Sequence, residues 1–227
     1  MTFILHIETA TKTCSTAISK NGVLIDIIEE HPENYIHSEK LTSNIQELTK
    51  RNQIAFKQLS AVSFSSGPGS YTGLRIGSST AKGICYALNI PLISIPTLQV
   101  YDICARKMGV RGNVCSMIDA RRMEVYSCIS NGIDVLKQTS PDVLDEDSYL
   151  RFDPLTVVGD GAFKVKNIWS HRKIAFLFDV TLSSKYQVEL AYKKFNNQDF
   201  ENLALFEPNY YKEFQTTQTK NSKKLTK

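Results

Sequence analysis

The chain has 227 residues, of which 42% are hydrophobic and 22% charged, values typical of one globular domain or two small lobes. No apolar run approaches the roughly 18 residues of a membrane helix, so we expect no contact with a membrane. The N-terminus MTFILHIETA lacks a basic region and predicts a strand rather than a signal peptide. Five cysteines without a C-x-x-C pair favour neither a zinc site nor disulfides and indicate a cytoplasmic protein.

The net charge of +4 comes from the last residues of the chain. Residues 215–227 contain four lysines and no acid, and the 27 basic residues less these four equal the 23 acidic ones. Such a tail is typical of a solvated, disordered end, which we favour. The alternative is a tRNA-binding module; in that case, deleting the tail would weaken tRNA binding and flatten its salt dependence.

The first hundred residues predict the order βββαβαβα. Asn21-Gly22 is a strong hairpin signal between two strands. Leu41, Ile45 and Leu48 form the stripe of an amphipathic helix. The last helix of this half follows Pro96, with Thr97 as its expected cap. The predicted strands are 3–9, 14–19, 23–30, 59–65 and 91–95, and the predicted helices are 37–51, 71–88 and 97–107.

The second half repeats the opening pattern of the first. IETATKTCSTAISKNGVLID and IDARRMEVYSCISNGIDVLK both place an Ile-acid pair at the end of a strand and an Asn-Gly turn after the next. This predicts an internal duplication, although two unrelated hairpins would give the same signal. The elements expected after 108 are strands 113–120, 123–130, 133–137 and 156–158, an apolar segment 174–178, and helices 144–150, 163–169 and 183–196.

Two lobes that each open with a three-stranded meander match the plan of the actin-like ATPase and sugar-kinase superfamily. We therefore predict an α/β, duplicated actin-like (ribonuclease H-like) fold in which the second lobe is reduced. The expected divisions are an N-terminal lobe at 1–107, a reduced lobe at 108–214 and the tail at 215–227.

An actin-like ATPase holds phosphates on hairpins with a D-x-G turn, because glycine lets backbone amides approach the ligand. The matching turns here are Glu8-Thr9-Ala10-Thr11 and Asp119-Ala120-Arg121-Arg122, and neither has the glycine. Glu8, Thr9, Asp119 and Arg121 are thus expected to mark a vestigial nucleotide cleft. The two arginines either meet an anion through their side chains or form a solvated turn, which we favour.

The stretch SSGPGSYTGLRIGSSTAKG carries five of the eleven glycines but fits no phosphate-binding template. Gly69, Gly73, Gly77 and Ala81 stand at four-residue steps and form a helix ridge without bulky side chains. Each helical glycine costs about 1 kcal/mol, which close packing of another helix would offset. That helix belongs to the same lobe or to a partner. We expect Gly73→Leu or Gly77→Leu to abolish partner binding and leave the lobe folded.

No catalytic set is predicted. The chain has no G-x-S-x-G nucleophile elbow. A metal-binding His pair at i and i+4 would need histidine four residues after His37, where Leu41 stands. We therefore expect no catalytic residue and no metal ligand.

The sequence up to about Tyr211 resembles the TsaB (YeaZ) family. The matching segments are ILHIETATKTCSTAIS, HSEKL, SSGPGSYTGLRIGSSTAKGICYALNIPLISIPTL, IDARRMEVY, VGDGA and EPNYY. Glu8 stands where the family more often has Asp, and the lysine-rich tail lies outside the pattern.

The resemblance implies a non-catalytic paralogue of TsaD, the actin-like enzyme that makes threonylcarbamoyladenosine in the anticodon loop of tRNA. It implies a scaffold that pairs with TsaD, or with itself when alone, and that is joined by a TsaE-like ATPase. ATP and metal would then reside on the partners, and the H-x-x-x-H metal motif of TsaD is broken here at Leu41. Pairing through helices 37–51 and 71–88 would involve His37, Leu41, Ile45, Tyr71, Gly73, Leu74, Gly77, Ser78 and Ala81.

The alternative function is a small nucleotide hydrolase or kinase that uses Glu8 and Asp119. Tight binding of ATP and magnesium, lost in Asp119→Ala, would favour it.

Overall fold

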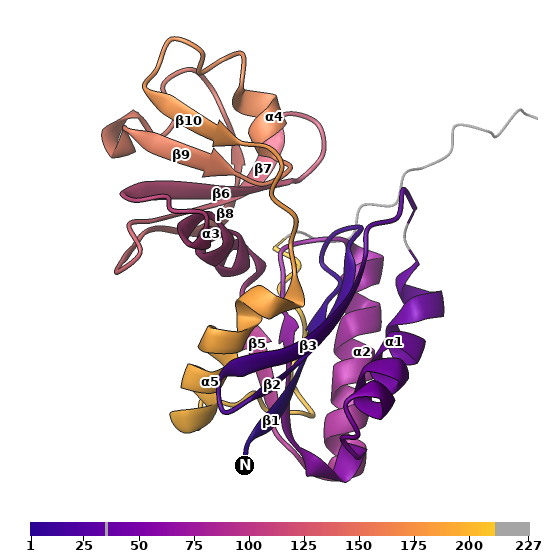
Figure 1. The fold of residues 1–227 in the computed structure, drawn as a ribbon. Helices are drawn as coiled ribbons and strands as arrows, with labels where there is room; N and C mark the ends of the chain where they lie inside the picture. The colour runs from indigo at the N-terminus through magenta and orange to yellow at the C-terminus, as the bar shows by residue number, and fades with distance from the viewer. Residues whose placement is uncertain (35, 212–227) are drawn as a thin grey trace, which may run out of the picture.

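The computed structural model describes residues 1–34 and 36–211, which form two lobes, each built on a five-stranded sheet (Figure 1). The first sheet has the order β3-β2-β1-β4-β5 and the second the order β10-β9-β6-β7-β8. The strands of the first sheet are β1 (Phe3–Glu8), β2 (Cys14–Lys20), β3 (Val23–Glu30), β4 (Leu59–Ser65) and β5 (Leu92–Ile95). Those of the second are β6 (Asn113–Asp119), β7 (Glu124–Ser130), β8 (Val135–Val143), β9 (Leu155–Val158) and β10 (Ile174–Leu177).

The two sheets have the same topology. In each, an antiparallel meander (β1-β2-β3 or β6-β7-β8) is extended by two strands parallel to its first member. Read from the meander edge, both orders are third, second, first, fourth and fifth strand of the lobe. The internal duplication predicted from the repeated Ile-acid and Asn-Gly pattern is thereby confirmed.

The helices cover the sheets unequally. Helices α1 (His37–Arg51) and α2 (Tyr71–Leu88) pack on one face of the first sheet, and α5 (Val188–Asn196) contacts β1, β3 and β5. On the second sheet α3 (Thr97–Lys107) packs against β6, β7 and β9, and the four-residue α4 (Ala162–Val165) contributes to the other face. The second lobe is therefore the reduced one, as predicted. Among the described residues, no helix combines the length and the apolar character needed to span a membrane.

Two helices cross over between the lobes. Helix α3 follows β5 of the first sheet but packs on the second, and α5 follows β10 of the second but packs on the first. The boundary predicted between residues 107 and 108 falls directly after α3, and the division of the chain there stays a prediction. A single hydrophobic cluster joins the lobes because α3 lies between them (Figure 1). Its members include Ile4, Ile93, Leu98, Tyr101, Val114, Ile118 and Val158.

The glycine ridge of α2 faces the β1–β2 turn of its own chain and, at Gly73, the start of α1. A Cβ on Gly73 would lie 2.1 Å from the carbonyl oxygen of Thr9, and one on Gly77 would lie 2.3 Å from Thr9 Oγ1. Thr9 Oγ1 also donates a hydrogen bond to the Gly73 carbonyl at 2.8 Å. The two glycines thus let α2 approach the β1–β2 turn. A Cβ on Gly73 would also lie 3.3 Å from His37 Cδ2 at the start of α1, so the preceding helix of the same lobe meets the ridge at this position. Packing of a partner's helix on the ridge stays a prediction.

Three local predictions also differ from the structure. Residues 144–150 are not helical, because the Asp145 carboxylate accepts hydrogen bonds from Ser148 Oγ and from the Asp147 amide, which compete with a helix. Thr97 is the first helical residue and not the cap, and its hydroxyl accepts from the Gly67 amide at 3.1 Å. The helix expected at 163–169 is confined to Ala162–Val165.

A pair of alanine substitutions on α2 tests the ridge. We expect Gly73→Ala to lower the free energy of unfolding by about 2 kcal/mol or more, because the added Cβ meets backbone atoms. Gly83→Ala is the matched control: nothing lies within 4 Å of its Cβ, so it should raise that free energy by about 1 kcal/mol.

Chemical denaturation of both variants measures the two effects. Equal stability of the two variants would contradict the assignment of Gly73 to the turn contact.

Candidate functional site between the lobes

The first candidate turn is closed by its own acidic residue. Glu8 ends β1, and its fully buried carboxylate accepts a hydrogen bond from the Ala10 amide at 2.8 Å and another from the Ser65 hydroxyl. Burial raises the pKa of Glu8 above its ordinary value, although these hydrogen bonds oppose the rise. The backbone amide that a phosphate oxygen would need is therefore already bound by a carboxylate.

The second turn repeats this arrangement. Asp119 ends β6, and its carboxylate accepts from the Arg121 amide at 2.5 Å, two residues on, as Glu8 does from Ala10. Asp119 also forms an ion pair with Lys164 at 2.6 Å, and its own amide donates to the Asp160 carboxylate at 2.9 Å. Both turns thus use an internal carboxylate where an ATPase would place phosphate.

Glycines hold the loops after β4 and β9 against these turns. A Cβ on Gly69 would lie 2.5 Å from the Ala10 carbonyl oxygen, and one on Gly159 would lie 2.1 Å from that of Met117. Because the loops press directly on the strand ends, the glycines serve packing within the chain. The interpretation that SSGPGSYTGLRIG is not a phosphate cradle agrees with this geometry.

A segment near the end of the described chain links the two lobes. In residues 207–211, the Asn209 amide donates to the Ser66 carbonyl at 2.7 Å. The Tyr210 ring lies 4.8 Å from that of Tyr71 on α2, and the Tyr126 hydroxyl on β7 donates to the Tyr210 carbonyl at 3.4 Å. We call residues 207–211 the closing segment. The sequence offered one signal for it, the EPNYY match.

A buried polar chain fastens α5 to the first sheet. Gln187 precedes α5; its amide nitrogen donates to the Ile7 carbonyl at 2.9 Å, and its amide oxygen accepts from Ser63 Oγ at 2.9 Å. The chain continues from Ser63 to His6 at 2.7 Å. Burial lowers the pKa of His6 to about 3, so this histidine is neutral near pH 7. Nothing in the sequence pattern marked Gln187, because a single glutamine before a helix carries no periodic signal.

The four residues of the predicted vestigial cleft differ in burial. Glu8 and Thr9 are buried under α2 and the crossing elements, whereas Asp119 and Arg121 are exposed. Within residues 1–34 and 36–211, no hydrogen bond or ion pair joins the first two to the second two.

Most of the residues predicted to contact a partner are buried in this chain. Tyr71 alone among them is half-buried. The buried ones are His37, Leu41, Ile45, Gly73, Leu74, Gly77, Ser78 and Ala81. They contribute to the core between α1, α2 and the first sheet, and pairing of the chain through them stays a prediction.

His37 is likewise committed inside the chain. Its Nε2 lies 2.8 Å from the Thr11 carbonyl oxygen, and burial lowers its pKa. Leu41 is buried one turn further along α1. Among the described residues, no cluster of three or more His, Cys, Asp or Glu side chains is arranged to hold a metal ion.

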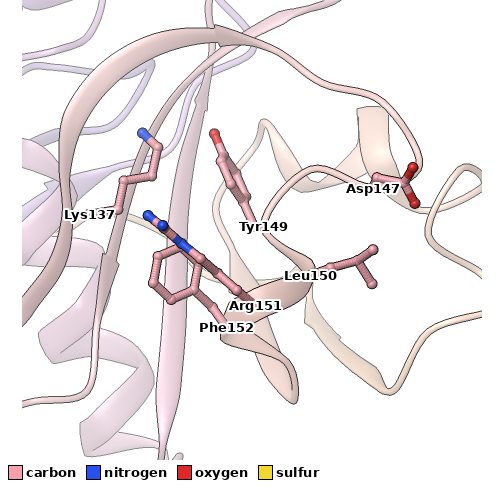
Figure 2. A pocket seen from close by; sticks show the side chains of 6 residues that line it. All are labelled: Lys137, Asp147, Tyr149, Leu150, Arg151 and Phe152. Atoms are coloured by element: carbon pink, nitrogen blue, oxygen red, sulfur yellow. The ribbon is translucent and has the colours of Figure 1, made fainter.

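A separate surface hollow of about 360 Å³ lies on the second lobe (Figure 2). It is lined by Lys137 of β8 and by Asp147, Tyr149, Leu150, Arg151 and Phe152. The Lys137 ammonium is held by the Asp142 carboxylate at 2.8 Å, and the Tyr149 hydroxyl donates to the same carboxylate at 2.8 Å. Two polar groups of this hollow, those of Lys137 and Tyr149, are therefore already bound to Asp142.

Comparisons with known proteins fit this geometry. The family model described as "TsaD: tRNA N6-adenosine threonylcarbamoyltransferase" matches residues 31–220. The tRNA threonylcarbamoyladenosine biosynthesis protein TsaB of Haemophilus influenzae is 32% identical over 123 residues, covering 54% of this chain and 51% of the relative. The protein of the same name from Bacillus subtilis is 32% identical over 143 residues, covering 61% and 60%. The matched part thus spans little more than half the length of these relatives.

The structure of YeaZ from Pseudomonas aeruginosa superimposes with a TM-score of 0.79 at 22% identity, covering 92% of this chain and all of that one. This likeness shows the fold, a duplicated actin-like α/β fold of two lobes, as predicted from the sequence. Together with the family model, these relatives show that the chain belongs to the TsaD family, in its TsaB (YeaZ) group.

Proposed function

We propose that this protein is a non-catalytic subunit that pairs with a TsaD-type paralogue. The complex would add threonylcarbamoyl to N6 of adenosine in the anticodon loop of tRNAs that read codons starting with A. One observation carries the proposal: Glu8 and Asp119 bind the Ala10 and Arg121 amides of their own turns. A chain whose phosphate-binding amides are occupied by its own carboxylates is suited to support an ATP-dependent partner.

The lost metal motif supports the same function. His37 hydrogen-bonds to the backbone of Thr11, and Leu41 replaces a second histidine in the core. In this proposal ATP and metal belong to the partner subunits, this chain has no cofactor of its own, and a TsaE-like ATPase joins the complex in the cytoplasm.

The outward face of α2 is the surface that best fits a partner helix. It carries a stripe of exposed residues at helical spacing: Thr72, Arg75, Ser79, Gly83 and Tyr86. Tyr86 is 82% exposed, and no atom lies within 4 Å of a Cβ built on Gly83. An exposed aromatic beside small residues allows close packing of another helix. The pairing helix of the sequence prediction is kept, but the contact moves from its buried ridge to this stripe.

A substitution at the open glycine tests pairing. We expect Gly83→Leu to abolish co-elution with the cognate TsaD-type protein in size-exclusion chromatography, because the leucine occupies the space that a partner helix needs. The chain itself should remain folded, since leucine is favoured over glycine in a helix by about 1 kcal/mol.

Asn196→Leu at the exposed end of α5 is the matched control and should pair normally. Normal co-elution of Gly83→Leu would contradict pairing through this stripe. The same experiment on the isolated chain reports self-pairing.

The alternative, a nucleotide hydrolase or kinase using Glu8 and Asp119, is tested by calorimetry with ATP and magnesium. We expect no tight binding by the isolated chain, because the Ala10 and Arg121 amides already have acceptors. Tight binding that disappears in Asp119→Ala would overturn the proposal in favour of the enzyme.

A further inference from the structure

Three parallel strands of the second sheet end at one edge. Strands β6, β9 and β10 are parallel, so the segments that follow them lie side by side there (Figure 1). These are the turn at 120–123, the loop that leads into α4, and Phe178. In open α/β sheets, the carboxyl edge of parallel strands is where ligands bind.

Three stacked phenylalanine rings lie at this edge. The Phe163 ring of α4 is 4.5 Å from that of Phe178 with 26° between their planes, and Phe178 is 5.5 Å from Phe176 with 3° between planes. Phe163 ends the stack and is 61% exposed. The stack therefore continues from the hydrophobic core to the surface and ends on an open ring.

Exposed cations lie at the same edge of the sheet. Lys166 Nζ lies 5.2 Å from the Phe178 ring centroid, and the Arg121 and Arg122 side chains are exposed in the neighbouring turn. Lys164, next to Phe163, connects α4 to that turn through Asp119 at 2.6 Å and the Glu124 carbonyl at 2.7 Å. In the part of the chain that the structure describes, Arg121, Arg122 and Lys166 form no ion pair.

The two arginines of the turn at 120–123 have an unfavourable backbone conformation. Arg121 and Arg122 have φ of 69° and 51°, in the left-handed region that favours glycine and asparagine. Folding alone would favour Asn and Gly at these positions, so a role for the guanidinium groups outside the fold is indicated.

We propose that this basic aromatic edge, formed by Arg121, Arg122, Phe163, Lys166 and Phe178, binds a single-stranded segment of RNA. A base would stack on Phe163, and the three cations would contact phosphates on either side. Unpaired cations beside an exposed aromatic ring fit single-stranded RNA, whose phosphates are negatively charged and whose bases are flat rings. A protein surface rarely alternates these two features. The inference rests on the proposed function for the identity of this RNA, the loop of a tRNA.

The binding test uses the full chain and a fluorescein-labelled, unmodified anticodon stem-loop RNA, followed by fluorescence anisotropy. A fully paired RNA duplex of the same length is the comparison, and the stem-loop should bind more tightly. Phe163→Ala should weaken stem-loop binding about fivefold or more, the loss expected for one base–aromatic stack. Phe56→Ala, an exposed phenylalanine of the first lobe, is the matched control and should leave binding unchanged.

A double substitution separates charge from folding. Arg121→Asn with Arg122→Gly suits the left-handed backbone, so the melting temperature should stay the same or rise. RNA affinity should nevertheless fall, and the slope of log K against log salt should flatten by about 1.4, the value for two lost phosphate contacts on a single strand. Lys50→Ala with Lys57→Ala removes two exposed charges of the first lobe and should change neither quantity.

The inference is overturned if Phe163→Ala and the arginine variant both bind the stem-loop with wild-type affinity. It is also overturned if the duplex and the stem-loop bind equally tightly. Loss of pairing with the TsaD-type protein in the arginine variant, with RNA binding intact, also overturns it and assigns the edge to a protein partner. Deleting residues 215–227 should leave the Phe163 effect in place. If the wild-type chain fails to pair with the TsaD-type protein but shows the RNA pattern, the proposed function is wrong and the RNA surface stands.

Discussion

The packing of this protein depends on the contact between the β1–β2 turn and α2. Thr9 lies directly against Gly73 and Gly77, so the helix and the strand end form one packed unit. This contact buries Thr9. Glu8 completes the closure by binding the Ala10 amide, so the turn is satisfied without a ligand.

The crossing of α3 and α5 joins the two lobes to each other. Each helix packs on the sheet of the other half, and one hydrophobic cluster runs through both lobes. Gln187 adds hydrogen bonds to Ile7 and Ser63 inside the first sheet. Moving the lobes apart would expose apolar surface of this shared cluster, so the packing favours one fixed arrangement over opening and closing.

The order of the elements and the duplication could be predicted from the sequence, because periodicity and Asn-Gly turns are local signals. The crossing of α3 and α5 could not be predicted, since an apolar stripe on a helix shows which face is buried but not which sheet covers it. The ridge of Gly73 and Gly77 was identified correctly as a place of close approach, but spacing cannot say what approaches. At the site, Glu8 and Asp119 were recognised as equivalent positions. Their bonds to the amides two residues on depend on side-chain direction, which no spacing encodes.

A closed cleft changes where interactions with other molecules can occur. The exposed stripe of α2 and the carboxyl edge of the second sheet are separate surfaces, and the closing segment contacts elements that belong to both lobes. Tyr210 in that segment packs on Tyr71 at the start of α2 and accepts a hydrogen bond from Tyr126 on β7. The segment thus adds to the shared core in fixing the position of α2 relative to the second sheet. An enzyme of this fold needs a cleft that opens to admit substrate, whereas a subunit that positions RNA for a neighbouring active site needs a constant distance between its two surfaces. In the proposed function, the shared hydrophobic cluster and the closing segment would provide that constancy.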